Sequence, residues 1–338
     1  MKKIIRFLSF IKKLSVEFFA KWKNYGFLLA WYNLIWWLCF YLRPPFTLKI
    51  STWAILRKTR WLDKYFMKNY DDIIEHFRCL SVEQNNDEIK SSYTIWVFWG
   101  QGEENMPPLV KACYRQLTRY NSNVILLSNH NIDKYVIIPS KIKERVSRKE
   151  ISWAFFSDII RNALLAKYGG LWLDATAWVS GSIPINELKE FDIFSPTGDE
   201  KLSSKSPIFW SGFEWHWSGW CLWARKSNEL LFSFVREMLI NVALREKEIP
   251  DYVTIDYLIY FACRNFTSVS RKMKQMETKY CYNRHRLAAM MNEPFDMSKY
   301  VELIKDDFVF KLSFRSPWKK YTSKGEQTFY GYILSKNE

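Results

Sequence analysis

Between residues 93 and 262, apolar residues form short continuous runs that alternate with segments of helical spacing. Runs typical of buried strands lie at 94–99, 123–127, 171–173, 193–195 and 220–224. Apolar residues recur with helical spacing over 107–120, 153–168, 228–245 and 251–262. A further strand is expected at 308–314. Because strands and helices alternate in the first half of this region, the pattern predicts an α/β fold with parallel strands.

The most informative segment is 157–176, SDIIRNALLAKYGGLWLDAT, which joins a predicted helix to a predicted strand. Gly169 supplies the left-handed position that commonly ends a helix. The chain is expected to reverse at Gly169 and Gly170 and to enter a short apolar strand. Asp174 then lies at the carboxyl end of that strand, which is the edge where ligands bind in open α/β sheets.

Three charged residues of this segment suggest a site for a sugar nucleotide. The carboxylate of Asp174 is a hard oxygen ligand that suits Mg²⁺ or Mn²⁺ beside a diphosphate. Asp158 and Arg161 share a helix face at i, i+3, where a carboxylate can accept from hydroxyl groups and a guanidinium can donate to oxygens. The alternative is that Asp158 and Arg161 form an ordinary ion pair and that Asp174 merely begins a turn.

The segment resembles the capsular polysaccharide synthesis glycosyltransferases, relatives of the Asp-X-Asp sugar transferases. The matching residues are Ser157, Asp158, Arg161, Tyr168, Gly169, Gly170, Leu173 and Asp174. The resemblance extends over about 93–334 and implies a GT-A type, Rossmann-like fold, a nucleotide-sugar donor and a divalent cation held by the acidic motif. The second acidic position of that motif is Thr176 here. Metal binding would then rest on Asp174 together with the diphosphate.

The resemblance also implies where the rest of the donor site lies. It places Phe98, Trp99 and Gly100 beside the nucleotide base, and it adds Gly170 and Thr176 to the donor-binding residues. Ser316 and Trp318 match loosely a C-terminal segment that closes the nucleotide site in related transferases, although the histidine of that segment is missing. Lys311, Arg315, Lys319 and Lys320 are expected either to bind diphosphate or to form a solvated basic face. Trp96 and Phe98 fit a buried strand equally well.

One acidic residue within an apolar helix is a candidate catalytic group. Asp256 lies among apolar residues, where a carboxylate needs a partner or a function. Related transferases carry an acidic residue facing the reaction centre on the corresponding helix, so Asp256 is expected to stabilise the transition state or position the acceptor. The alternative is an ion pair with Arg264 or another cation. Asp251 is better explained as the N-cap of the same helix.

The positive charge of the chain is concentrated at the N-terminus. Residues 1–70 contain 14 Lys or Arg and two acidic residues, and contribute +12 of the net +15. Within them, the uncharged aromatic segment 27–42 would span only ~24 Å as a helix, less than the ~30 Å hydrocarbon core. These features predict a helical region that lies on an anionic membrane surface, with a single membrane-spanning helix as the alternative. The chain is thus divided into a membrane-association region at 1–70, a linker at 71–92 and a transferase domain at 93–338.

Other partners and compartments follow from charge and cysteine spacing. Residues 71–338 carry a net charge of only +3 without a recognised binding motif, which argues against nucleic acid. The six cysteines lack a metal-ligand or redox spacing, as suits a reducing cytosol. An aromatic belt at 209–223 is a candidate platform for an acceptor sugar, with lipid contact and simple core packing as alternatives.

Together, these observations predict a glycosyltransferase at the cytoplasmic face of the cell membrane. It would transfer a hexose, galactose or glucose, from a UDP-sugar to a lipid-linked oligosaccharide in capsular or cell-surface polysaccharide synthesis, with retention at the anomeric carbon. Because Thr176 replaces an acid, the alternative is a catalytically silent membrane scaffold of a polysaccharide-assembly complex. Transfer of a phosphosugar also stays open.

Overall fold

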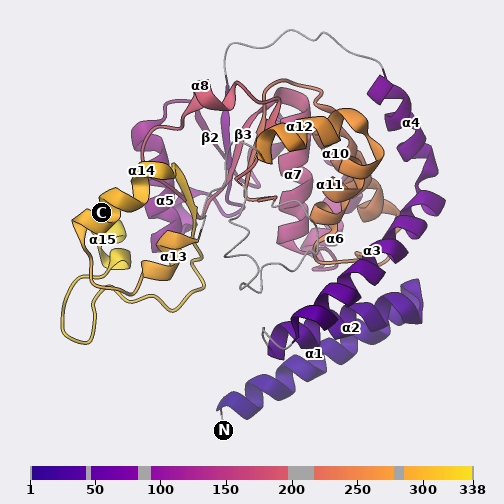
Figure 1. Ribbon diagram of the computed structural model, residues 1–338, viewed down its shortest axis with the longest axis horizontal. Helices are drawn as coiled ribbons and strands as arrows, with labels where there is room; N and C mark the ends of the chain where they lie inside the picture. Colours follow the sequence, from indigo (N-terminus) through magenta and orange to yellow (C-terminus); the bar gives the residue numbers. More distant parts are fainter. Residues whose placement is uncertain (1, 43–46, 83–92, 197–216, 278–284, 337–338) are drawn as a thin grey trace.

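A five-stranded sheet with strand order β2-β1-β3-β6-β5 forms the centre of the protein. The computed structural model describes residues 2–42, 47–82, 93–196, 217–277 and 285–336 (Figure 1). The strands are β1 (Ile95–Phe98), β2 (Val124–Leu127), β3 (Gly170–Asp174), β5 (Ile193–Phe194) and β6 (Cys221–Ala224). β1 pairs in parallel with β2 and β3, whereas β6 pairs antiparallel with β3 and β5. The predicted α/β class with parallel strands is therefore confirmed.

Helices cover both faces of this sheet. They are α5 (Pro108–Tyr120), α6 (Ser140–Ser147), α7 (Trp153–Tyr168), α10 (Leu230–Arg245), α11 (Thr254–Asn265) and α12 (Thr267–Glu277). The short 3-10 helices η1 (Glu103–Asn105) and η2 (Ile132–Lys134) lie in the loops. α7 and α10 lie on one side of the sheet and α5 on the other (Figure 1). The hydrophobic side chains of the sheet pack with those of the helices into one large core.

Local sequence explains how α7 delivers the chain to β3. The Ser152 side chain accepts from the backbone N–H of Phe155 at 3.2 Å and so caps the helix. Gly169 ends it at φ 70°. Gly170 has φ 92°, and a β-carbon there would lie 2.3 Å from the backbone oxygen of Thr94. Glycine at 170 thus permits the close approach of β3 to the start of β1.

The strand order creates a crevice at one edge of the sheet. The chain passes from β1 through α5 to β2, and then through α6 and α7 to β3 on the other side of β1. The connections therefore diverge from the carboxyl ends of β1 and β3, the topological switch point where open α/β sheets bind ligands. In the register of these strands, Phe98 pairs with Asp174 at that edge.

A smaller unit lies beside this edge. β4 (Ala177–Val179) pairs antiparallel with β7 (Val309–Lys311), and Ala177 pairs with Lys311. The helices α13 (Arg286–Met290), α14 (Met297–Asp306) and α15 (Phe329–Ser335) complete this unit, whereas α8 (Ile185–Leu188) packs into the main core. Trp178, Phe310 and Phe329 are buried in a second core with one face of α5. This unit carries Lys311 to the carboxyl end of β3.

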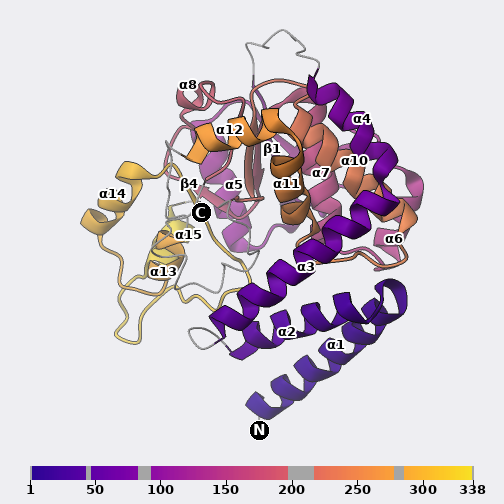
Figure 2. The ribbon, with the colours of Figure 1, turned by 45° about the vertical axis from the view of Figure 1, so that its right-hand side comes forward.

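Four helices precede the sheet: α1 (Lys2–Tyr25), α2 (Phe27–Leu42), α3 (Leu48–Asn69) and α4 (Asp71–Val82). α1 and α2 form a hairpin that projects from the body, and α3 runs from this hairpin back to the domain (Figure 2). Within the described ranges, no helix is both long and apolar enough to cross a membrane. Tyr25, Leu62 and Phe66 are buried in the same core as the central sheet, so the hydrophobic core extends across the predicted boundary at residue 70.

The predicted linker at 71–92 is wrong for residues 71–82, which form α4. Ile73, Ile74 and Phe77 recur at helical spacing and are buried in the main core, against α10. Asp71 and Asp72 lie in the first turn, where negative charge stabilises a helix. Residues 83–92 lie outside the described residues.

Buried polar contacts fasten the N-terminal helices to the α10–α11 connection. Lys58 of α3 forms an ion pair with Asp251 at 2.5 Å, and the ammonium of Lys21 donates to the backbone oxygen of Pro250 at 2.7 Å. The hydroxyls of Tyr65 and Tyr70 donate to Glu246 at 2.8 and 2.7 Å. The N-cap interpretation of Asp251 is wrong, because Val253 is the N-cap residue of α11; Asp251 accepts from the backbone N–H of Val253, and its closest partner is Lys58.

Candidate functional site

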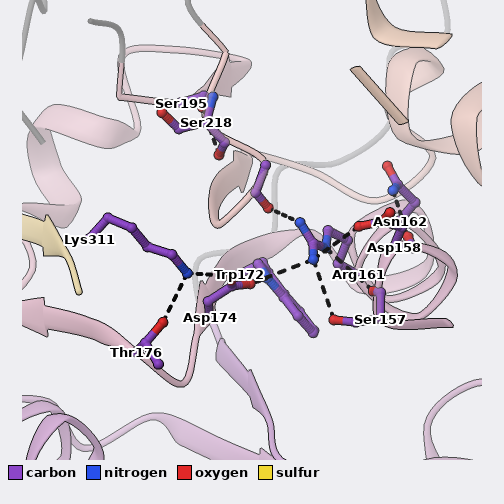
Figure 3. A network of polar contacts seen from close by, with 11 residues as sticks. Ser157, Asp158, Arg161, Asn162, Trp172, Asp174, Thr176, Ser195, Ser218 and Lys311 are labelled. Atoms are coloured by element: carbon purple, nitrogen blue, oxygen red, sulfur yellow. Dashed lines mark hydrogen bonds and ion pairs between the residues drawn. The ribbon is translucent and has the colours of Figure 1, made fainter. Parts of the chain in front are cut away.

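Asp174 is the centre of a charged cluster at the carboxyl edge of the sheet. Its Oδ2 accepts from Lys311 Nζ at 2.6 Å, and its Oδ1 accepts from the Trp172 indole at 3.0 Å (Figure 3). A guanidinium nitrogen of Arg161 lies 3.6 Å from Oδ1. Burial opposes ionisation of this carboxyl group, but the charges of Lys311 and Arg161 outweigh burial and lower its pKa to about 2. Asp174 is therefore a carboxylate at neutral pH.

Asp158 and Arg161 are both buried on α7, directly behind Asp174. Arg161 Nη2 lies 3.0 Å from Asp158 Oδ1, and its Nη1 donates to the backbone oxygen of Gly219. The guanidinium also lies 5.3 Å from the ring centroid of Trp172. Asp158 and Arg161 share a helix face as predicted and form the ion pair that was the alternative to ligand binding, and Arg161 also bridges Asp158 to Asp174 (Figure 3). The pair is thus part of the cluster rather than an isolated surface contact.

The pKa of Asp158 moves in the opposite direction from that of Asp174. Burial raises it to about 7, against the opposing charge of Arg161, and the charges of Asp256 and Asp174 raise it further. At neutral pH this carboxyl group is therefore divided between the acid and the carboxylate. The protonated acid can donate a hydrogen bond, whereas the carboxylate can only accept one.

Asp256 lies near this cluster, on the first turn of α11. Its charge acts on Asp158, which places the two carboxyl groups within electrostatic reach of each other. Arg264, one of the cations considered as a partner of Asp256, forms its ion pair with Asp63 of α3 at 2.5 Å. The catalytic role of Asp256 stays a prediction.

Lys311 is the residue of this site whose partner was not predicted. Its ammonium lies between Asp174 and Thr176 and donates to the Thr176 hydroxyl at 2.9 Å (Figure 3). The basic character of 311–320 was visible in the sequence. The partner was not, because it depends on the pairing of β7 with β4, which joins segments more than 130 residues apart.

The predicted contacts of the nucleotide base lie at the same edge. Phe98 ends β1 beside Asp174, and Trp99 and Gly100 follow it. The Trp99 ring meets the ring of Phe314 edge to face, with centroids 5.6 Å apart. Trp96, in contrast, is a buried core residue whose indole donates to the backbone oxygen of Gly169. The contact between Trp99 and Phe314 brings the segment that precedes Ser316 to the edge.

Two predicted donor-binding residues, Gly170 and Trp318, are packed against other parts of the fold. Gly170 begins β3, at the opposite end of the strand from Asp174, where it allows close backbone packing. Trp318 packs against the second core, and its ring centroid lies 6.0 Å from that of Tyr330. Ser316 accepts a backbone hydrogen bond from Trp318. In the aromatic belt, residues 209–216 lie outside the described residues, whereas Trp217, Trp220 and Trp223 are buried.

Comparison with known proteins assigns the chain to a family. The family described as "Capsular polysaccharide synthesis protein" matches residues 49–333. The chain belongs to this family. Among solved structures, it is similar to the apo-form glycosyltransferase GlyE of Streptococcus pneumoniae TIGR4, with 14% identity and a TM-score of 0.33. That similarity covers 72% of this chain and 63%, less than two thirds, of the GlyE chain. A search among curated proteins gives no match.

The cluster can be tested against the divalent cation that the sequence resemblance implies. Mg²⁺ and Mn²⁺ take several hard oxygen ligands. Here both carboxylate oxygens of Asp174 already face donors, and the Thr176 hydroxyl accepts from Lys311. The described residues contain no group of three or more His, Cys, Asp or Glu side chains arranged for a metal. In this arrangement the oxygen atoms of Asp174 and Thr176 suit an ammonium group and do not provide the ligand set of a divalent cation.

Proposed function

We propose that this protein is a GT-A type glycosyltransferase with a Rossmann-like donor domain. It transfers a hexose, glucose or galactose, from a UDP-sugar to a lipid-linked oligosaccharide in capsular polysaccharide synthesis. The observation that carries the proposal is the convergence of Asp158, Arg161, Asp174 and Lys311 at the carboxyl ends of β1 and β3. Membership in the capsular polysaccharide synthesis family supports the same role.

The geometry suggests a role for each group. Phe98 and Trp99 provide aromatic surface for the base at the end of β1. Asp158 can bind a hydroxyl of the sugar or ribose in either protonation state, and Arg161 holds it in place at 3.0 Å. Asp256 would face the anomeric carbon, where a carboxylate stabilises the positive charge of an oxocarbenium-like transition state.

The proposed reaction exchanges one bond to the anomeric carbon for another. The bond from this carbon to the diphosphate oxygen breaks, and its electron pair stays on the diphosphate. The acceptor hydroxyl oxygen forms the new bond. With retention, the outcome that the sequence resemblance favours, the acceptor attacks from the face that the diphosphate leaves, so its proton passes to a departing phosphate oxygen.

A donor panel tests the proposed activity directly. Purified protein is incubated with UDP-glucose, UDP-galactose and other nucleotide sugars, and hydrolysis and transfer are followed by mass spectrometry. We expect UDP release from at least one hexose donor, and a lower rate in the folded variant Arg161→Ala. Absence of both binding and hydrolysis for every donor would contradict the proposal and favour a catalytically silent scaffold.

The N-terminal helices support a location at the membrane surface. Phe19, Trp22, Phe27 and Trp31 are exposed, and their rings contact one another in sequence across the α1–α2 turn; we call them the aromatic patch. Lys12, Lys13 and Lys23 of α1 are also exposed. Exposed aromatic rings beside lysines match the interface of an anionic membrane. The proposed location is the cytoplasmic face of the cell membrane, where the lipid-linked acceptor would be bound.

Point substitutions test this location better than truncation, because α1 and α3 contribute to the main core. A variant with serine at all four positions of the aromatic patch should lose most of its co-sedimentation with vesicles of phosphatidylglycerol and phosphatidylcholine. Ile137→Ser, at an exposed apolar position of the transferase domain, serves as the control. Equal sedimentation of the patch variant and the intact protein at moderate salt would contradict the membrane proposal.

A further inference from the structure

We infer that Lys311 supplies the positive charge that binds the donor diphosphate, in the place that the sequence resemblance gives to a divalent cation. This inference rests on the proposed function, because it assigns a residue to the leaving group of that reaction. It starts from the observation that the oxygen atoms of Asp174 and Thr176 bind the ammonium group of Lys311, whereas Mg²⁺ and Mn²⁺ need several free oxygen ligands.

The geometry leaves one donor of Lys311 available for a ligand. An ammonium group has three N–H donors. Two are used, by Asp174 at 2.6 Å and by Thr176 at 2.9 Å. Among the described residues the third finds no acceptor. The side chains of Lys311 and Asp174 are 24% and 27% exposed, so a phosphate oxygen can approach.

The backbone at Lys311 and the surroundings of its ammonium group are both held by the fold. Lys311 pairs with Ala177 in the β4–β7 ladder, and the backbone N–H of Leu312 donates to the Thr176 oxygen at 3.1 Å. The Trp220 ring centroid lies 5.8 Å from Nζ. A group held in this way loses little further freedom when it binds a phosphate oxygen.

The contact with Lys311 accounts for a neutral residue at position 176. Thr176 accepts a hydrogen bond from the ammonium without adding a negative charge. Lys311 faces one carboxylate, that of Asp174, whereas Arg161 is shared between Asp158 and Asp174. A second carboxylate at 176 would set two negative charges against the single ammonium that the diphosphate is proposed to meet. The departure from the acidic motif and the presence of Lys311 therefore complement each other.

The chemical contribution of Lys311 is electrostatic. As the bond between the anomeric carbon and the diphosphate oxygen breaks, negative charge grows on the diphosphate. The third N–H of Lys311 donates to an oxygen of the departing diphosphate. The ammonium group stays protonated throughout, so the step needs no oxidant, reductant or additional acid. Asp174 acts as a positioning residue because it acts through Lys311.

The test measures UDP binding by calorimetry with excess EDTA and again with Mn²⁺. We expect the wild-type protein to bind UDP in EDTA, with an affinity that Mn²⁺ changes less than about threefold. Lys311→Met should weaken binding in EDTA about ten- to hundredfold, as expected for loss of a charge-assisted hydrogen bond. Thr176→Val should weaken it less. Lys305→Met, at an exposed lysine on α14, should bind as the wild type does.

The outcomes separate this inference from the proposed function. UDP binding that requires Mn²⁺ would overturn the role of Lys311 and leave the transferase proposal intact. Absence of UDP binding under both conditions would overturn both. Equal affinities of the folded variants Lys311→Met and Lys305→Met would also overturn the role of Lys311. The wild-type titration in EDTA decides the question even if Lys311→Met does not fold.

Discussion

Two of the lysine–aspartate pairs in this protein are of nearly equal length but lie in opposite environments. Lys58 and Asp251 lie 2.5 Å apart, with side chains that are 4% and 1% exposed. Lys311 and Asp174 lie 2.6 Å apart, and their side chains are 24% and 27% exposed. The first pair joins α3 to the connection between α10 and α11, and the second joins β7 to the end of β3. The distance between the charges therefore does not distinguish a structural pair from a functional one.

Solvent access and the surrounding groups do distinguish them. Lys58 also lies 4.3 Å from the ring centroid of Trp36, so protein encloses its ammonium. Two charges removed from water stabilise a fold only while both are present. Lys311 and Asp174 are about a quarter exposed, and only two of the three N–H groups of Lys311 are used by Asp174 and Thr176. We call Lys58–Asp251 the closed pair and Lys311–Asp174 the open pair. The closed pair is expected to affect stability, and the open pair is expected to affect ligand binding.

The largest expected effect follows from breaking the closed pair. Asp251→Asn leaves the charge of Lys58 buried without a counterion and should lower the free energy of unfolding by about 3–5 kcal/mol. Asp72→Asn is the matched control, because Asp72 pairs with Arg245 at an exposed site and should cost at most about 1 kcal/mol. Urea denaturation measures both. A loss for Asp251→Asn no larger than that of the control would contradict the assignment.

The open pair should affect catalysis instead. Asp174→Asn retains the shape of the side chain but removes the charge that positions Lys311. We expect hexose transfer to fall by about 10²–10³, the usual cost of losing one electrostatic contact to a transition state. Circular dichroism should show that the fold is intact. Near-normal transfer by the folded variant would remove Asp174 from the site and favour the scaffold alternative.

A smaller effect should appear in the pH dependence of stability. Burial raises the pKa of Asp158 from 3.8 to about 7, so between these pH values the folded state binds a proton that the unfolded state has released. Its contribution to stability is therefore present below pH 4 and is lost as the pH rises toward 7. Relative to Asp158→Asn, the wild-type protein should lose on the order of 3 kcal/mol over this range. Parallel stability profiles for the two proteins would contradict the shift.

Local patterns in the sequence predicted those parts of the site that lie close together along the chain. The helix over 153–168, the Gly169–Gly170 reversal and the apolar strand place Asp174 at the sheet edge without help from distant residues. Pairings across the fold were not predictable. Lys311 reaches Asp174 through the β4–β7 register, and Arg264 pairs with Asp63 rather than with Asp256 on its own helix. Such partners depend on tertiary packing, which helix and strand periodicity does not encode.

The predicted domain boundary failed for a related physical reason. The positive charge of 1–70 suggested a separate region, but charge describes the surface of the helices and not their buried faces. Tyr25, Leu62 and Phe66 contribute to the main core, and α4 occupies part of the predicted linker. The apolar spacing of Ile73, Ile74 and Phe77 was the signal that could have identified this helix.

The most direct test of the contrast between the two pairs is a side-by-side measurement of Lys311→Met and Lys58→Met. Each variant removes one ammonium from one pair. UDP affinity in EDTA and the melting temperature are measured for both. We expect Lys311→Met to lose about ten- to hundredfold in affinity with a melting temperature near that of the wild type. Lys58→Met should melt at a clearly lower temperature and bind UDP normally below it. The reverse pattern, or the same pattern for both variants, would contradict the assignment of the open pair to the donor and the closed pair to the fold.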